Sequence, residues 1–208
     1  VVRLRVVDDD GLEASCDASV TAQPTGGLRI ELYWNPPDRS CDTYEGPDCD
    51  GSDLDLHLLH PDALAWFDLS LDCYYATCRG EPAAWSPEGP GDDPLLPLDD
   101  VEGFGPETIN IVAPVEGFVY EVGVHYYASD RPRLIASAHV NIYCQSSDTH
   151  PTYSSGPVEL MPPTEEERDF WRVASVVIHG EEECEVSPHL SSDGTPDIIT
   201  DNAARASR

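Results

Sequence analysis

Residues 53–61 read Asp53-Leu54-Asp55-Leu56-His57-Leu58-Leu59-His60-Pro61. Apolar and polar side chains alternate here at the period of a β-strand. The first three leucines are therefore expected to face one side, and Asp53, Asp55 and His57 the other. Because the leucine side can enter a hydrophobic core, the stretch predicts a strand that presents two carboxylates and an imidazole on its opposite face.

Further alternating segments follow, separated by residues typical of turns. They are residues 1–7, 16–22, 28–34, 65–75, 108–112, 117–127, 134–143 and 170–178. Short strands at this spacing predict an all-β fold, an antiparallel β-sandwich of the jelly-roll-like kind. The sequence shows no alternation of strands with helices, which argues against a nucleotide-binding α/β fold.

Three parts of the chain differ in pattern. Residues 1–24 are expected to form two strands around a turn, and residues 27–189 to form the β-sandwich. Residues 190–208 are polar and lack periodicity, so we expect a disordered tail. A capping-box pattern starts at Thr164, with Glu167 three residues later, and predicts a short helical turn.

The chain is strongly acidic, with 40 Asp and Glu against 11 Lys and Arg among its 208 residues and a formal net charge of −29. Binding to nucleic acid through phosphate contacts and adhesion to anionic membranes both need Lys and Arg, so neither is expected. The charge suits the uptake of divalent cations. No run of 18 apolar residues occurs in the sequence, and membrane insertion by this segment is not expected.

Seven cysteines are scattered along the chain: Cys16, Cys41, Cys49, Cys73, Cys78, Cys144 and Cys184. Without a CxxC pair, this pattern favours disulfides over a zinc site, and hence an exported, oxidised protein. Cys41–Cys49 and Cys73–Cys78 can close short loops, and Cys144 and Cys184 can join two strand ends. Cys16 is then left over. Other pairings stay open, as do buried free thiols in a cytosolic protein.

A second acidic cluster lies at residues 98–107, where two Asp and two Glu surround Gly103 and Gly105. Calcium takes six to eight oxygen ligands in flexible geometry, and glycines let the backbone turn its carbonyls inward. We therefore expect a structural Ca²⁺ site between this loop and the strand at residues 53–59. Its predicted ligands are Asp53, Asp55, Asp99, Asp100 and Glu107, with Asp50 and Asp72 as weaker candidates.

Several alternatives stay open. The acidic residues can form a plain solvated surface. A zinc site is a further alternative because the chain contains His57, His60, His125 and His139. HExxH and CxxC are both missing, and single histidines on strands are more often hydrogen-bonded surface groups. Trp85 is the best candidate for an exposed sugar-binding aromatic. The sequence carries no GxSxG, P-loop or GxGxxG motif, so we expect no enzyme.

Two resemblances extend this interpretation. Residues 1–22 resemble the last two strands of a PKD (polycystic-kidney-disease-type, immunoglobulin-like) domain. Residues 28–189 resemble an uncharacterised class of bacterial exported β-sandwich domains, through Trp34 and the segments 53–58, 72–74, 99–107 and 124–126. The Asp-Leu-Asp-Leu strand is also similar to that of YfaP-type and bacterial prepeptidase-C-terminal-like sandwiches, which are accessory modules of secreted proteins, some of them calcium-binding.

The resemblance implies a non-catalytic, calcium-stabilised module of a surface protein or lipoprotein, within a longer multidomain chain. Such a module acts in adhesion or as an accessory domain, and a surface glycan or protein is its expected ligand. Two alternatives stay open: an ancillary carbohydrate-binding or carbohydrate-active domain, and a pure structural spacer.

Overall fold

The computed structural model describes residues 2–7, 13–18, 27–35, 51–85, 91–101, 105–129, 134–144, 149–180 and 183–207. Strands β1 (Val2–Val7) and β2 (Glu13–Ala18) pair antiparallel and form a two-stranded sheet of their own. Two strands were expected in this part of the chain. Whether they belong to a PKD domain stays a prediction.

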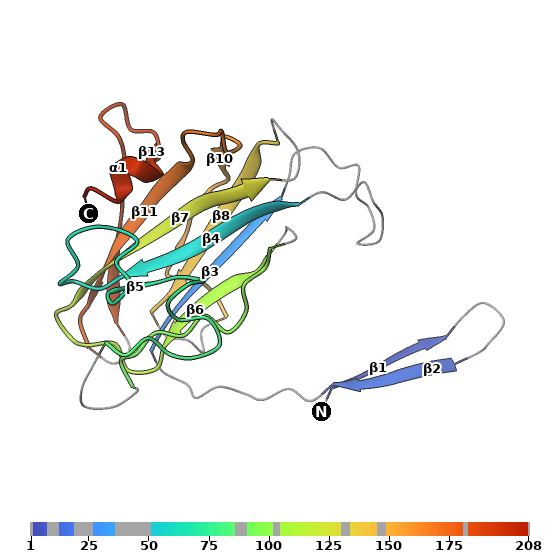
Figure 1. The fold of residues 1–208 in the computed structure, drawn as a ribbon. Helices are drawn as coiled ribbons and strands as arrows, with labels where there is room; N and C mark the ends of the chain where they lie inside the picture. Colours follow the sequence, from blue (N-terminus) through green and yellow to red (C-terminus); the bar gives the residue numbers. More distant parts are fainter. Residues whose placement is uncertain are drawn as a thin grey trace.

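The rest of the described chain forms two antiparallel sheets (Figure 1). The first contains, in spatial order, β10 (Val158–Leu160), β8 (Ala136–Tyr143), β3 (Leu28–Asn35) and β6 (Glu107–Ile111), with β9 (Tyr153–Ser154) beside β8. The second contains β12 (Cys184–Pro188), β11 (Asp169–Ile178), β7 (Val119–Ser129), β4 (Ser52–Leu59) and β5 (Asp72–Cys73), with β13 (Asp197–Thr200) beside β11. The predicted antiparallel β-sandwich is confirmed.

The main hydrophobic core lies between the two sheets, where alternate residues of each strand point inward. Leu54, Leu56 and Leu58 of β4 are fully buried there, as the alternation predicted. They pack with residues of the opposite sheet such as Ile30 and Val140. Burying a leucine side chain contributes roughly 1.5–3 kcal/mol, so this face of β4 is a large part of what holds the sheets together.

A second, smaller hydrophobic cluster covers the outer face of the second sheet. Its buried members are Leu59, Ala63, Trp66, Phe170 and Ala204. Two segments supply the cover: the turns of residues 60–78, and the stretch that contains β13 and helix α1 (Asp201–Ala204). The backbone N–H of Trp66 donates to the carbonyl of Ala204 at 3.2 Å, which ties the two segments together. The face of β4 that carries Asp55 and His57 is therefore buried as well.

The expected disordered tail is wrong for residues 197–204. Strand β13 pairs with Asp169–Arg172 of β11, and Thr200 caps α1 by accepting a hydrogen bond from the N–H of Ala203. Local periodicity gave no signal, because a four-residue strand owes its conformation to the neighbour with which it pairs.

Two smaller expectations also differ from the structure. Residues 65–75 form turns, and only Asp72–Cys73 is a strand. Thr164 does accept a hydrogen bond from the N–H of Glu167 at 2.9 Å, but no helix follows, because β11 begins two residues later.

Two disulfides lie within the described residues, Cys73–Cys78 and Cys144–Cys184. Both were expected from the cysteine positions. The Cys41–Cys49 pairing and the side chain of Cys16 lie outside the described residues. In the described part of the chain, no helix has the length and apolar character that crossing a bilayer requires.

Candidate metal centre

Three carboxylates from separate segments meet beside β4. Asp55 belongs to β4, Glu107 begins β6, and Asp99 lies in the segment 91–101. One oxygen from each lies within 4.8 Å of the others. Asp55 is 2% exposed and Glu107 is fully buried, so these are interior carboxylates.

The edge of β4 explains why Glu107 points inward. Strand β7 pairs with β4 along one edge, whereas β5 pairs only with Leu58 and Leu59 on the other. The N–H of Leu56 therefore lacks a strand partner and donates instead to Oε2 of Glu107 at 2.7 Å. The second oxygen, Oε1, accepts the N–H of Asp100 at 3.2 Å. Since buried N–H groups need an acceptor, Glu107 joins the segment that contains Asp100 to the edge of β4.

Burial makes ionisation of this group unfavourable. It raises the pKa of Asp55 to about 7 and the pKa of Glu107 to about 9. A positive charge lies beside the group: Nη1 of Arg79 is 2.7 Å from Oδ2 of Asp99. Three ionised carboxylates beside one guanidinium leave two negative charges, which a divalent cation would neutralise.

Two histidines share the outer face of the sheet with Asp55. Asp55 is the cross-strand partner of His125, and His57 is the partner of Gly123. One nitrogen of each imidazole and one oxygen of Asp55 lie within 4.8 Å of one another. Nδ1 of His125 lies 3.3 Å from Oδ2 of Asp55, which is long for a hydrogen bond. Burial lowers the pKa of His125 to about 3, so this imidazole is neutral.

A carboxylate orients the second imidazole. Oδ2 of Asp72, on β5, lies 2.9 Å from Nδ1 of His57 and also accepts the N–H of Phe67 at 2.7 Å. Both His57 and Asp72 are fully buried. Phe67 has a φ of 64°, a conformation that non-glycine residues adopt rarely and that often marks functional sites.

Aromatic rings enclose the two histidines. The ring of His57 stacks on that of Tyr74, with 4.6 Å between the ring centroids. The centroids of Phe67 and Phe170 lie 4.8 Å and 5.3 Å from that of His57. Gly123 makes room for them, since a Cβ at this position would lie 2.6 Å from the ring of Phe170.

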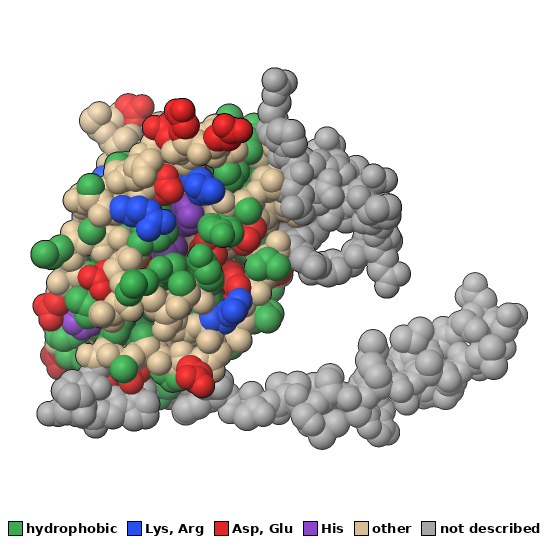
Figure 2. All heavy atoms as spheres, in the orientation of Figure 1, with side chains coloured by type: hydrophobic (Ala, Val, Ile, Leu, Met, Phe, Trp, Pro, Cys, Tyr) green, Lys and Arg blue, Asp and Glu red, His purple; other side chains and the backbone are tan. Residues whose placement is uncertain are grey.

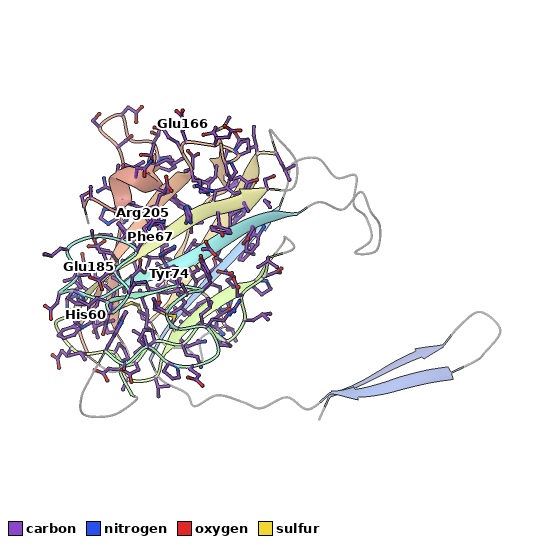
Figure 3. All side chains as sticks on the ribbon, in the orientation of Figure 1. His60, Phe67, Tyr74, Glu166, Glu185 and Arg205 are labelled. Atoms are coloured by element: carbon purple, nitrogen blue, oxygen red, sulfur yellow. A yellow bond between two sulfur atoms is a disulfide. The ribbon has the colours of Figure 1, made fainter. Side chains whose placement is uncertain are left out.

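The outer cover of this site is visible in the figures. The guanidinium of Arg205 lies 3.8 Å from the ring centroid of Phe67. Figure 3 shows Arg205, Phe67 and Tyr74 close together between α1 and β5. Figure 2 shows histidine side chains among arginine and hydrophobic side chains in the middle of this face.

The structure brings some of the predicted ligands together and leaves others apart. Asp55, Asp99 and Glu107 form one group of three, whereas Asp53 and Asp100 belong to neither group of ligand atoms found among the described residues. A register shift between β4 and β7 separates Asp53 from Asp55. Asp100 contributes its backbone N–H to Glu107.

The weaker candidates and the histidines differ more from expectation. Asp50 lies outside the described residues, and Asp72 contacts His57 rather than the acidic group. The interpretation of strand histidines as surface groups is wrong for His57 and His125, which are 0% and 2% exposed. The available signal was the position of each on an alternating strand, on the side away from the core.

A cluster of Ser175, His189 and Glu121 on the second sheet has the residue types of a hydrolase triad but not its geometry. Nε2 of His189 lies 3.2 Å from Oγ of Ser175 and 2.7 Å from Oε2 of Glu121. In a triad the two imidazole nitrogens serve the nucleophile and the acid separately. Here one nitrogen faces both, which does not activate the serine.

Comparison with known proteins adds no relative: no family model, no curated protein and no solved structure matches the chain.

Proposed function

We propose that the β-sandwich is a non-catalytic, calcium-stabilised module of an exported protein, with Asp55, Asp99 and Glu107 as protein ligands. The observation that carries this proposal is the meeting of three carboxylate oxygens, from three segments, within 4.8 Å in the interior. The ion would hold the segment 91–101 against the edges of β4 and β6, and its role would be structural.

Charge and donor chemistry support a divalent ion. Arg79 offsets one of the three carboxylates, and calcium would offset the other two. Asp99 Oδ1 is buried without a hydrogen-bond partner among the described residues, which leaves it available as a ligand. Calcium prefers oxygen ligands and tolerates irregular geometry, whereas magnesium demands near-ideal octahedral geometry.

Burial of the carboxylates favours a structural role over sugar chemistry. A glycosidase needs two carboxyl groups that flank a sugar bond in an open cleft. Asp55 and Glu107 are covered by protein and cannot contact a glycan chain. An adhesive or accessory role would therefore use other surfaces of the module, and the ion would stabilise the scaffold that presents them.

Export is supported by the two disulfides, because disulfides persist in oxidising compartments. An extracellular or periplasmic setting also supplies calcium at the concentrations that weak structural sites require.

The experiment is a thermal melt of the oxidised protein in EDTA and then in millimolar Ca²⁺ or Mg²⁺. Saturation to about 100 times Kd adds about 2.7 kcal/mol, which corresponds to a rise in Tm of roughly 5–10 °C. Glu107→Gln should fold with some loss of stability: the carboxamide is uncharged, as burial favours, but it can accept the N–H of Leu56 or of Asp100 and not both.

The variant Glu107→Gln should lose the calcium response. Asp62→Asn is the matched control, since the Asp62 side chain is 84% exposed, and it should keep the response. Equal shifts in both variants, or none in the wild type, would rule the calcium site out.

A further inference from the structure

We propose that Asp55, His57 and His125 form a second kind of metal site, which takes a first-row transition ion with Zn²⁺ as its representative. This goes beyond the proposed calcium function, because the ion and two of the three donors differ, and Asp55 is shared by the two sites. Two imidazole nitrogens and one carboxylate oxygen suit zinc and its neighbours, whereas calcium takes oxygen ligands.

The spacing of the donors fits such an ion. All three ligand atoms lie within 4.8 Å of one another, and His125 Nδ1 lies 3.3 Å from Asp55 Oδ2. Two ligands at about 2.0–2.1 Å from a tetrahedral ion lie roughly 3.3 Å apart. The separation of His125 Nδ1 and Asp55 Oδ2, which is long for a hydrogen bond, is therefore the separation expected for two ligands of one zinc ion.

Buried imidazole nitrogens without a hydrogen-bond partner are a second feature of this site, separate from its spacing. Nε2 of His57 and Nε2 of His125 are buried and have no hydrogen-bond partner among the described residues. Native structures pair nearly all buried polar atoms, so the unpaired Nε2 of His57 calls for a missing partner. A bound ion supplies it for His57, whose other nitrogen already faces Asp72. An ion bound through Nδ1 of His125 leaves the Nε2 of that ring as it is.

Asp72 is a positioning residue in this site. By accepting from Nδ1–H of His57 it fixes the tautomer whose lone pair is on Nε2. A carboxylate behind a ligating histidine is a recurrent arrangement at zinc sites, where it orients the ring and raises its basicity. The N–H of Phe67 holds the same oxygen of Asp72, so the turn at Phe67 supports the ligand from outside.

Charge balance points to a divalent ion. His125 is neutral by burial, and Asp55 and Asp72 together carry two negative charges when ionised. A divalent cation offsets both, in a site whose His57 ring lies among the rings of Tyr74 and Phe170. The enclosed surroundings also predict slow release of the ion.

The test uses the oxidised protein, stripped with EDTA and desalted. Zn²⁺ is titrated in competition with a chromophoric chelator, and Co²⁺ replaces zinc as a spectroscopic probe. We expect one tight equivalent per chain, and visible Co²⁺ bands of the strength that a four-coordinate, nitrogen-containing site gives. His125→Gln should weaken zinc binding at least 100-fold, whereas His179→Gln, an imidazole 47% exposed, should leave it unchanged.

Two further variants separate this proposal from the calcium proposal. Glu107→Gln should lose the calcium response and keep zinc affinity, and His125→Gln should do the reverse. Asp72→Asn covers the case in which His125→Gln fails to fold, because it leaves all three ligands in place and should weaken zinc binding about 10- to 100-fold. Tight zinc binding that survives both His125→Gln and Asp72→Asn, or an absence of a tight equivalent in the wild type, would overturn the proposal.

Discussion

The two faces of β4 are both buried, but by different means. On the inner face, leucines pack between two sheets in a large hydrophobic core. On the outer face, Asp55 and His57 lie under a small aromatic cluster that two loop-rich segments provide. The inner face needs nothing beyond protein atoms, whereas the outer face leaves carboxylates and imidazole nitrogens without full compensation. Stability comes from the first face, and ligand chemistry from the second.

The largest expected effect breaks the connection between the sheets. Cys144 follows β8 of one sheet and Cys184 begins β12 of the other, 40 residues apart. In the chain-entropy model, replacing both by serine lowers the free energy of unfolding by about 4 kcal/mol, against about 2 kcal/mol for the five-residue separation of Cys73 and Cys78. Urea unfolding of both double variants measures the difference. Equal losses would contradict the entropic account.

Leu56→Ala tests the inner face alone. It leaves a cavity in the core, and we expect the free energy of unfolding to fall by about 3 kcal/mol. The loss should be the same in EDTA, calcium and zinc, because the alanine backbone still donates to Glu107. Urea unfolding in the three buffers checks this, and an ion-dependent loss would show that the two faces are coupled.

Asp72→Asn tests the outer face alone, and a smaller effect on stability is expected. The carboxamide oxygen can replace Oδ2 and accept both hydrogen bonds, but without the negative charge that strengthens them. The free energy of unfolding should therefore fall by about 1–3 kcal/mol in EDTA. The calcium-induced rise in Tm should be unchanged, since Asp72 does not belong to the carboxylate group. If Asp72→Asn abolished the calcium-induced rise in Tm, the two proposed sites would have to be a single site.

The last expected effect, measured over pH 7 to 9 only, is the pH dependence of the metal-free protein. Glu107 has a folded pKa of about 9 against an ordinary value of 4.5, so between these values the folded state binds the extra proton. Stability from this group is complete below pH 4.5 and falls as pH rises toward 9. Between pH 7 and 9 two other buried groups add little to the change of stability with pH. They are Asp55, with a pKa of about 7, and His125, with a pKa of about 3. Melts in EDTA should show the decline, and Glu107→Gln should flatten it.

Much of the inner face could be predicted from the sequence. Alternation in residues 53–59 identified the buried leucines, because side-chain direction in a strand depends only on position. The same rule placed Asp55 and His57 together on the other face. Nearness in sequence also indicated the Cys73–Cys78 disulfide.

The outer face depends on pairing that no local pattern encodes. Asp55 meets His125 only through the register of β4 against β7, 70 residues along the chain. The cover comes from turns around Phe67 and from β13, whose four residues show no periodicity. The sequence therefore predicted a metal site at the acidic residues and favoured surface groups over a zinc site for the histidines, since it could not show that this face was covered.

The order of the elements along the chain has a consequence for how the outer face is completed. Asp55, His57, Asp72 and His125 all precede the residues that close over them, Ala204 and Arg205. A chain made from its N-terminus thus exposes the donors to solvent before their cover exists. An ion that binds them would enter an open site during synthesis and leave a closed one afterwards, so that loading and loss follow different routes at different rates.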